Sequence, residues 1–138
     1  MDEQEKQRKQ QEEQAKAQRK VEITAEIGRN NGEINTLRND IKECEKFKSD
    51  MEKASAKLYS AANNIDKSNS DLIQAYKSSE AAQYKSKLIK GSEKIKSIAK
   101  KIIGSTIPDV ENKIKELNKK ITDKQNRINV LQNEMNTL

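Results

Sequence analysis

Apolar residues between positions 34 and 76 recur at steps of three and four. The repeating positions are Ile34, Leu37, Ile41, Cys44, Met51, Leu58, Ala62, Ile65, Leu72 and Tyr76. This spacing predicts one long helix with a single heptad seam, because it returns to the same face every two turns. Lys48, Ser55 and Asn69 are the weak positions of the seam, and Asn69 could instead fix the register of the pairing.

The seam extends upstream through Ile23 and Ile27. Between these residues and Ile34 lie Gly28 and Gly32, each of which costs a helix about 1 kcal/mol relative to alanine. We therefore expect residues 27–34 to be the least stable stretch of this arm.

A second heptad seam occupies the end of the chain. Its positions are Ile107, Val110, Ile114, Leu117, Ile121, Lys124, Ile128, Leu131, Met135 and Leu138, of which only Lys124 is not apolar. Before this seam a broader apolar face is formed by Ala81, Leu88, Ile95, Ile98, Ala99, Ile102 and Ile103. The two seams predict two long helices that pack against each other.

The turn between the two helices is expected at residues 77–80. Ser78 or Ser79 can cap a helix that begins near Glu80, whose carboxylate favours the positive end of the helix. The predicted fold is therefore all-α: an elongated, antiparallel two-helix coiled-coil hairpin over residues 21–138. Residues 1–20 are almost entirely polar and are expected to form a tail or a frayed helix.

One irregularity is predicted in the return helix, near Gly104 to Pro108. A proline inside a helix costs about 3 kcal/mol, and Thr106 could cap a new helix that carries Pro108 in its first turn. We expect a kink or a short break there. The alternative is a three-helix bundle of residues 20–75, 79–103 and 106–138.

The composition argues against catalysis and against a thick globular core. Only 32% of residues are hydrophobic, 36% are charged, and the chain has no histidine and one cysteine. The commonest general base is therefore missing, and one cysteine cannot supply an ordinary zinc site. The sequence predicts a non-enzymatic protein with no cofactor and no metal. Cys44 is interpreted as a small buried residue, with an intermolecular disulfide as the alternative.

The net charge of +6 arises from the second half of the chain. Lysines cluster there at Lys85, Lys87, Lys90, Lys94, Lys96, Lys100 and Lys101. Few arginines and aromatic residues accompany them, which argues against nucleic acid or a membrane surface as the partner. A solvated helix face or a surface for an acidic protein is the favoured interpretation, and a basic nucleic-acid or membrane-surface binder is the third hypothesis for function.

Localisation is expected to be cytoplasmic. The sequence begins Met1-Asp2-Glu3-Gln4 without an apolar signal core, and it has no apolar run long enough to span a bilayer. Export by a route that needs no such signal is the alternative.

The region around the turn resembles a known family. Tyr76-Lys77-Ser78, followed by Ala81, Ala82 and Tyr84, is similar to the Trp-x-Gly turn of the WXG superfamily of type VII secretion, and residues 41–88 resemble its YwqH-like branch. The resemblance implies a helical helper that binds the N-terminal region of an LXG toxin, together with a second small helical helper. Tyr and Ser replace the family's Trp and Gly, and no Tyr-x-x-x-Asp/Glu export signal follows, which implies export with a partner.

The leading hypothesis is a chaperone or targeting factor that binds a helical partner through apolar residues outside the seams. The expected partner-binding residues are Phe47, Tyr59, Tyr76, Tyr84, Leu88, Ile89, Ile98 and Ile103. Helix-in-groove contacts use such side chains at helical spacing. The second hypothesis is a self-associating structural coiled coil, in which the same residues close a homo-oligomer.

Overall fold

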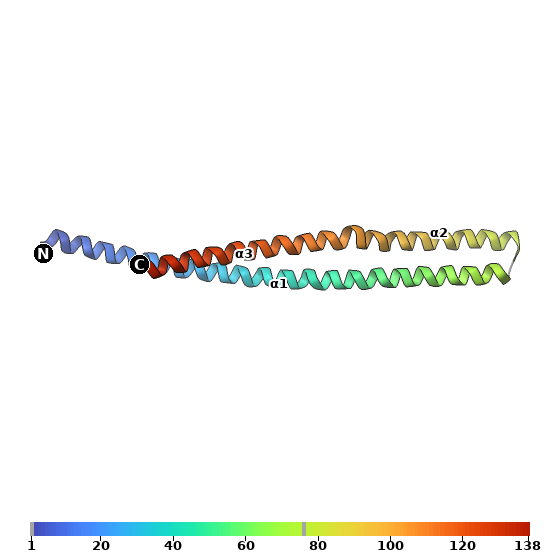
Figure 1. The fold of residues 1–138 in the computed structure, drawn as a ribbon, viewed down its shortest axis with the longest axis horizontal. Coiled ribbons are helices and arrows are strands. Elements are labelled where there is room, and N and C mark those ends of the chain that lie inside the picture. Colours follow the sequence, from blue (N-terminus) through green and yellow to red (C-terminus); the bar gives the residue numbers. More distant parts are fainter. Residues whose placement is uncertain (1, 76) are drawn as a thin grey trace. The chain divides into compact units, whose positions relative to one another are not determined.

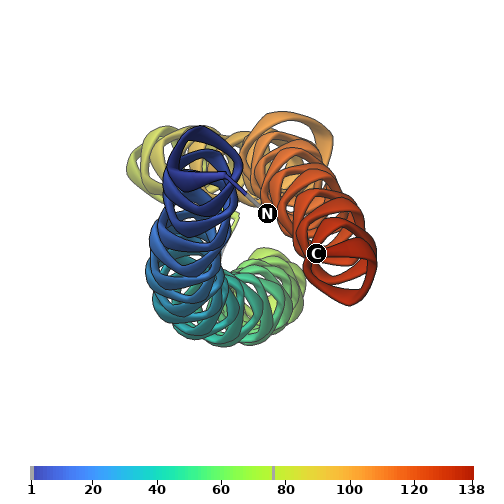
Figure 2. The ribbon, with the colours of Figure 1, turned by 90° about the vertical axis from the view of Figure 1, so that its left-hand side faces the viewer.

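The computed structural model describes residues 2–75 and 77–138, and every regular element in those ranges is helical. The elements are α1 (Glu3–Ala75), α2 (Ser79–Lys101), a π-helical turn η1 (Ile102–Thr106) and α3 (Ile107–Thr137) (Figure 1). A view from the end at which the chain begins shows the same coils (Figure 2). The prediction of an all-α hairpin is confirmed: α1 is the first arm, and α2, η1 and α3 form the return arm.

The turn lies where the cap residues predicted it. α1 ends at Ala75 and α2 begins at Ser79, with Ser78 as the N-cap. The hydroxyl of Ser78 accepts a hydrogen bond from the backbone N–H of Ala81 at 3.1 Å, which satisfies one of the free donors at the start of the helix. Glu80 lies in the first turn of α2, where its negative charge interacts favourably with the positive end of the helix dipole. Tyr76 lies outside the described residues.

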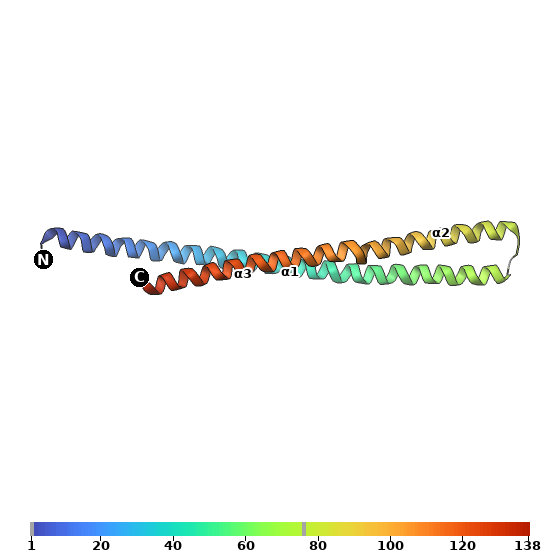
Figure 3. The ribbon, with the colours of Figure 1, turned by 45° about the horizontal axis from the view of Figure 1, so that its top comes forward.

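The hairpin consists of two compact units. Unit 1 comprises Met1–Lys42 and Lys115–Leu138, and unit 2 comprises Glu43–Ile114. Within unit 1, α1 pairs with α3, and within unit 2, α1 pairs mainly with α2 (Figures 1 and 3).

Large aliphatic side chains fill the seam of unit 1. Ile34, Ile121 and Ile128 form a buried cluster, and Ile27, Leu37 and Ile41 pack against it. Ile23 and Leu131 are completely buried, and Leu117 is nearly so. The upstream extension of the first seam is confirmed, and so is the packing of the two seams against each other, here through Ile34, Ile121 and Ile128.

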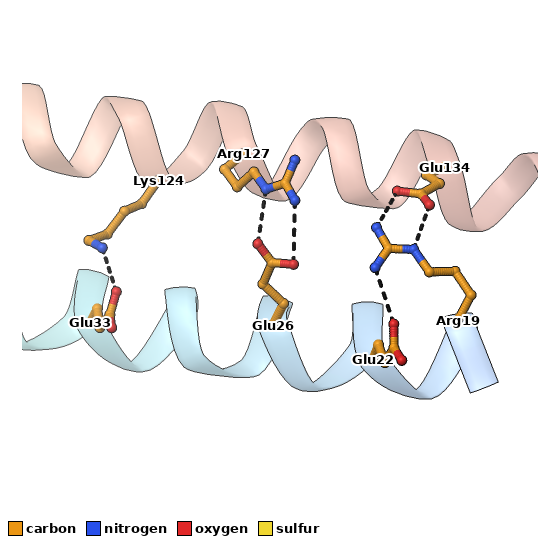
Figure 4. A network of polar contacts seen from close by, with 7 residues as sticks. All are labelled: Arg19, Glu22, Glu26, Glu33, Lys124, Arg127 and Glu134. Carbon is orange, nitrogen blue, oxygen red and sulfur yellow. Dashed lines mark hydrogen bonds and ion pairs between the residues drawn. The ribbon is translucent and has the colours of Figure 1, made fainter.

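Figure 4 shows ion pairs that join the two arms of unit 1. The Arg19 guanidinium donates to both oxygens of Glu134, at 2.6 and 2.8 Å, and the Arg127 guanidinium donates to both oxygens of Glu26, at 2.9 and 3.4 Å. Lys124, the charged position of the second seam, donates to Glu33. Two of the three contacts are therefore bidentate, the geometry that gives an arginine–carboxylate pair its directional specificity.

The predicted interruption of the return arm is a π-helical turn, and the arm does not break. The N–H of Ile107 donates to the carbonyl of Ile102, five residues earlier, and the backbone stays right-handed helical. Pro108 has no N–H to donate to Gly104, and its ring would clash with that carbonyl in an α-helix, so a wider turn relieves both problems. Thr106 lies inside the turn. The prediction that it caps a new helix is wrong, and so is the three-helix alternative.

The π turn also corrects the phase of the seam. Ala99 and Ile102 belong to the seam before the turn, and a heptad continued from them would place Thr106 and Asp109 in it. The inserted residue places Ile107 and Val110 there instead, and Ile107 is buried. The five-residue step from Ile102 to Ile107 in the sequence is the signal of this turn.

Candidate protein-binding face

The two helices of unit 2 meet through a layer of small residues. Ser55, Ala62 and Asn69 of α1 and Ser92 and Ala99 of α2 are all buried. We call these five residues the small-residue layer. Side chains of this size let the backbones of two helices approach closely.

Two hydroxyl bonds hold this layer in register. Ser55 Oγ donates to the carbonyl of Ala99, and Ser92 Oγ donates to the carbonyl of Ala62, each at 3.3 Å. A serine hydroxyl lies only one bond beyond Cβ, so these contacts require the two backbones to lie side by side. Ser55, a weak position of the predicted seam, is thus one of the residues that fix the pairing.

A second layer of unit 2 holds the large side chains, and it is only half-buried. It consists of Met51, Leu58, Ile65, Leu88, Ile95 and Ile102, all of intermediate exposure. We call this the large-residue layer. In a closed two-helix coiled coil the large residues would be the most buried, whereas here the small ones are. Some apolar surface of unit 2 therefore stays in contact with solvent.

An ion pair identifies the two sides of the α1–α2 seam. Lys96 Nζ donates to Asp66 Oδ2 at 2.7 Å across the helices, so the flank of α1 that carries Asp66 lies on the same side as the flank of α2 that carries Lys96. The hydrogen bond from Lys96 is the main cause that lowers the pKa of the Asp66 carboxyl. On heptad spacing, Tyr59 shares the flank of Asp66, and Ile89 and Ile103 share the flank of Lys96.

The other side of the seam is the candidate site, and we call it the open face. Heptad positions place Phe47, Ala54, Ala61 and Ser68 of α1 there, together with Tyr84, Gly91 and Ile98 of α2. Phe47 is 46% exposed, Tyr84 66% and Ile98 54%. Each residue of the large-residue layer follows a residue of one of these rows by four positions, so it lies next to that row on the side of the seam. The layer therefore lies between the two rows. The open face is thus an apolar strip that uses both helices.

The two edges of the open face carry opposite charge. Beyond the α1 row lie the exposed residues Glu43, Asp50, Lys57, Asn64 and Asp71. Beyond the α2 row lie the exposed lysines Lys87, Lys94 and Lys101, and the ammonium of Lys87 stands 5.7 Å from the centroid of the Tyr84 ring. Three of the predicted basic cluster therefore form one edge of an apolar surface, and the facing edge is mainly acidic.

A cavity of about 500 Å³ lies at the end of the open face next to the turn. Leu72, Tyr84 and Leu88 contribute apolar surface to it, and Ser78 and Asn69 contribute polar groups. Asn69 is 5% exposed, and its Oδ1 has no hydrogen-bond partner among the described residues. Burial of a polar oxygen without a partner is costly.

The predicted partner-binding residues divide between the two sides. Phe47, Tyr84 and Ile98 lie on the open face, and Leu88 lies in the adjoining large-residue layer. Tyr59, Ile89 and Ile103 lie on the opposite flank, with Ile89 and Ile103 exposed and Tyr59 half-buried. Tyr76 is outside the described residues. The partner-binding residues predicted from the sequence do not include the small members of the face, Ala54, Ala61, Ser68 and Gly91. Their heptad spacing relative to Phe47, Tyr84 and Ile98 is the feature of the sequence that could have identified them.

Other candidate chemistry is limited. Among the described residues, no group of three or more His, Cys, Asp or Glu side chains is placed to hold a metal ion. Cys44 is a free thiol of intermediate exposure on α1. Within residues 2–75 and 77–138 no helix has the length and apolar character needed to cross a membrane.

Comparison with known proteins adds no further constraint. No protein-family model matches the chain, and no curated protein and no solved structure is detectably similar to it.

Proposed function

We propose that this chain is a non-enzymatic protein that binds helices of another protein on the open face of unit 2. The observation that carries the proposal is the inverted burial of unit 2. Its small residues are buried, while Phe47, Tyr84 and Ile98 are exposed beside a half-buried large-residue layer. An apolar strip of this kind, flanked by charged edges, is typical of a protein–protein contact.

The form of the strip favours a helix as the bound element. Its rows follow heptad spacing on two parallel axes, which matches the spacing of an incoming helix with apolar residues at i, i+3, i+4 and i+7. Ala54, Ala61 and Gly91 leave space for large side chains of the partner. The basic edge at Lys87, Lys94 and Lys101 would contact acidic residues beside the partner's apolar stripe, and the α1 edge would contact basic ones.

Within this proposal, the favoured partner is the helical N-terminal region of an LXG toxin. Support comes from the resemblance of residues 41–88 to the YwqH-like branch of the WXG superfamily, since the α1 row of the open face and Tyr84 lie in this part of the chain. The protein would then act as a chaperone or targeting factor that covers the toxin's apolar helices before type VII secretion.

The test is co-expression of the full chain with the N-terminal region of an LXG toxin encoded beside it. We expect one peak in size-exclusion chromatography that contains both proteins. Ile98→Asp should abolish the complex, because it places a charge in the middle of the apolar contact. Ile89→Asp is the matched control: it is the same substitution on the same helix, on the opposite flank, and should leave the complex intact.

Two outcomes would contradict the proposal. If neither protein alters the elution of the other, the toxin assignment fails. If a complex forms and Ile89→Asp disrupts it while Ile98→Asp does not, the open face is not the binding surface. Circular dichroism of each variant shows whether the helices are retained.

A further inference from the structure

We infer that, in the absence of another protein, the open face is covered by a second copy of the same chain. The two copies would form a symmetric four-helix contact between their unit 2 segments, in which α1 of each copy lies on α2 of its partner copy. This inference rests on the open face itself and stands whether or not the proposed toxin partner is correct.

Size complementarity is the first argument for this arrangement. The α1 row consists of Phe47 and the small residues Ala54, Ala61 and Ser68, whereas the α2 row has the large residues Tyr84 and Ile98 on either side of Gly91. α1 on α1 would set small residues against small ones and leave voids, and α2 on α2 would set large against large. Only α1 on α2 places large side chains into the spaces beside small ones, as close packing requires.

Charge complementarity is the second argument, and it favours the same pairing. If α1 lay on α1, the edge with Glu43, Asp50 and Asp71 would face its own copy, and the three lysines of α2 would face one another. If α1 lies on α2, the mainly acidic edge faces the basic edge on both sides of the contact: Lys101 and Lys87 lie near Asp50 and Asp71, while Lys94 lies near Lys57 and Asn64. Like charges brought together across an interface oppose association, so the second arrangement is favoured.

The symmetry axis follows from these two arguments. A twofold axis parallel to the helices exchanges α1 and α2 across the contact and brings both hairpin turns to the same end. Rotation about this axis does not change the position of a residue along it, so equivalent residues of the two copies lie at the same level. Because Ser55 is level with Ala99, and Ala62 with Ser92, Lys101 of one copy would come within about one helical turn of Asp50 of the other. Lys87 and Asp71 would form a corresponding pair.

The first experiment measures the mass of the full chain by sedimentation equilibrium at micromolar concentrations. We expect a dimer. Ile98→Asp should raise the dimer Kd by about tenfold or more, because the charge would be buried in the contact. Ile89→Asp, on the opposite flank, should leave the Kd unchanged. A monomeric wild-type chain, or a dimer that responds to Ile89→Asp but not to Ile98→Asp, overturns the inference.

The second experiment tests the arrangement of the helices. Lys101→Glu and Asp50→Lys should each weaken the dimer, and the double variant K101E/D50K should regain most of the lost affinity, since the pair is restored with its signs exchanged. If Asp50→Lys strengthens the dimer, α1 lies on α1 and the proposed pairing is wrong. If both single variants weaken it and the double variant weakens it further, the two residues are not partners and the proposed pairing is also wrong.

A monomeric wild-type chain would leave the open face free, and the co-expression test of the proposed function would keep its meaning. Conversely, a dimer that forms as expected while no toxin complex is found would support this inference and remove the toxin assignment. The two proposals therefore fail separately.

Discussion

Units 1 and 2 join the same α1 helix to the return arm in different ways. In unit 1 the seam is filled by isoleucine and leucine, and ion pairs join the arms. In unit 2 the buried positions between α1 and α2 hold serine, alanine and asparagine. Two hydroxyl-to-carbonyl bonds and the Asp66–Lys96 ion pair hold this pairing, and Lys48 pairs with Glu111 where α1 meets α3. The large seam residues of unit 2 are therefore only half-buried, whereas several of those in unit 1 are fully buried.

The surfaces of the two units differ accordingly. Of the large apolar residues that are exposed in the described part of the chain, Val21 and Val130 belong to unit 1. Those in unit 2 are Phe47, Leu72, Tyr84, Ile89, Ile98 and Ile103. A hollow of unit 1 is lined largely by Asn, Gln and Arg side chains, whereas the cavity beside the turn in unit 2 is mainly apolar. A two-helix seam that buries its large residues leaves little to bind, and one that buries its small residues leaves an apolar face.

The largest expected effect on stability comes from the core of unit 1. Leu131→Ala should lower the free energy of unfolding by about 2–4 kcal/mol, because it removes a completely buried side chain and leaves a cavity. Val130→Ala, on the exposed side of the same helix, is the control and should cost less than about 1 kcal/mol. Urea unfolding followed by circular dichroism measures both. Equal effects would mean that the seam of unit 1 is not closed as the structure has it.

Unit 2 should respond to enlargement of its small residues. Ala62→Leu should cost about 1–3 kcal/mol, because the larger side chain would push the two backbones apart and break the hydrogen bond from Ser92. Ala56→Leu adds the same atoms at an exposed position of α1 and should be nearly neutral. If Ala62→Leu raises the unfolding midpoint in urea instead, close approach of the helices is not required in unit 2.

A gain of stability is expected from the glycines of unit 1. Gly32→Ala should raise the free energy of unfolding by about 0.5–1 kcal/mol, because glycine has the higher conformational entropy in the unfolded chain. A Cβ built at this position meets no atom within 4 Å, and the backbone is α-helical. Thermal unfolding of the variant and the wild type provides the measurement. A loss of stability would contradict the open space that the structure shows around Gly32.

The smallest expected effect concerns the pH dependence of the ion pairs in unit 1. A hydrogen bond from Arg19 lowers the pKa of the Glu134 carboxyl, and one from Arg127 lowers the pKa of the Glu26 carboxyl. A carboxyl whose pKa is lower in the folded state stabilises the fold above its unfolded pKa of about 4.3 and loses that contribution as the pH falls through the folded value.

Acidification from pH 7 to pH 3 should therefore lower the melting temperature of the wild type more than that of Glu134→Gln, which cannot titrate at that position. The difference should shrink in high salt, because the pair is partly exposed and screened. Glu12→Gln, on the exposed stretch before the paired region, is the control, and acidification should lower its melting temperature as much as that of the wild type. An unchanged acid response in Glu134→Gln would mean that this pair does not contribute to the stability of unit 1.

The two arms could be predicted from the sequence because heptad spacing is a local property of the chain. Ile34 and Ile121 repeat with the same period, and such repeats can be buried only against each other. The turn was predictable for the same reason, since Ser78 caps its helix through atoms three residues away. The π turn was predicted only as a defect, because its form depends on how the seams on both sides of Pro108 align with α1.

The candidate site was only partly predictable. The sequence identifies Phe47, Tyr84 and Ile98 as apolar residues outside the seam. It does not separate them from Tyr59, Ile89 and Ile103, which lie on the opposite flank. Asp66 and Lys96 distinguish the flanks, and their pairing requires knowledge of the register. Ser55 and Asn69 looked like weak positions because residue type alone does not show whether a partner helix is near enough to bury a small side chain.

The sequence by itself determined that this protein is helical, where it turns back and which residues form its seams, because periodicity and capping act over a few residues. Only the tertiary structure decided which seam residues are buried, which flanks share a side and where apolar surface remains. Those properties depend on the distance and register between two helices, which are set by contacts between residues far apart in the chain.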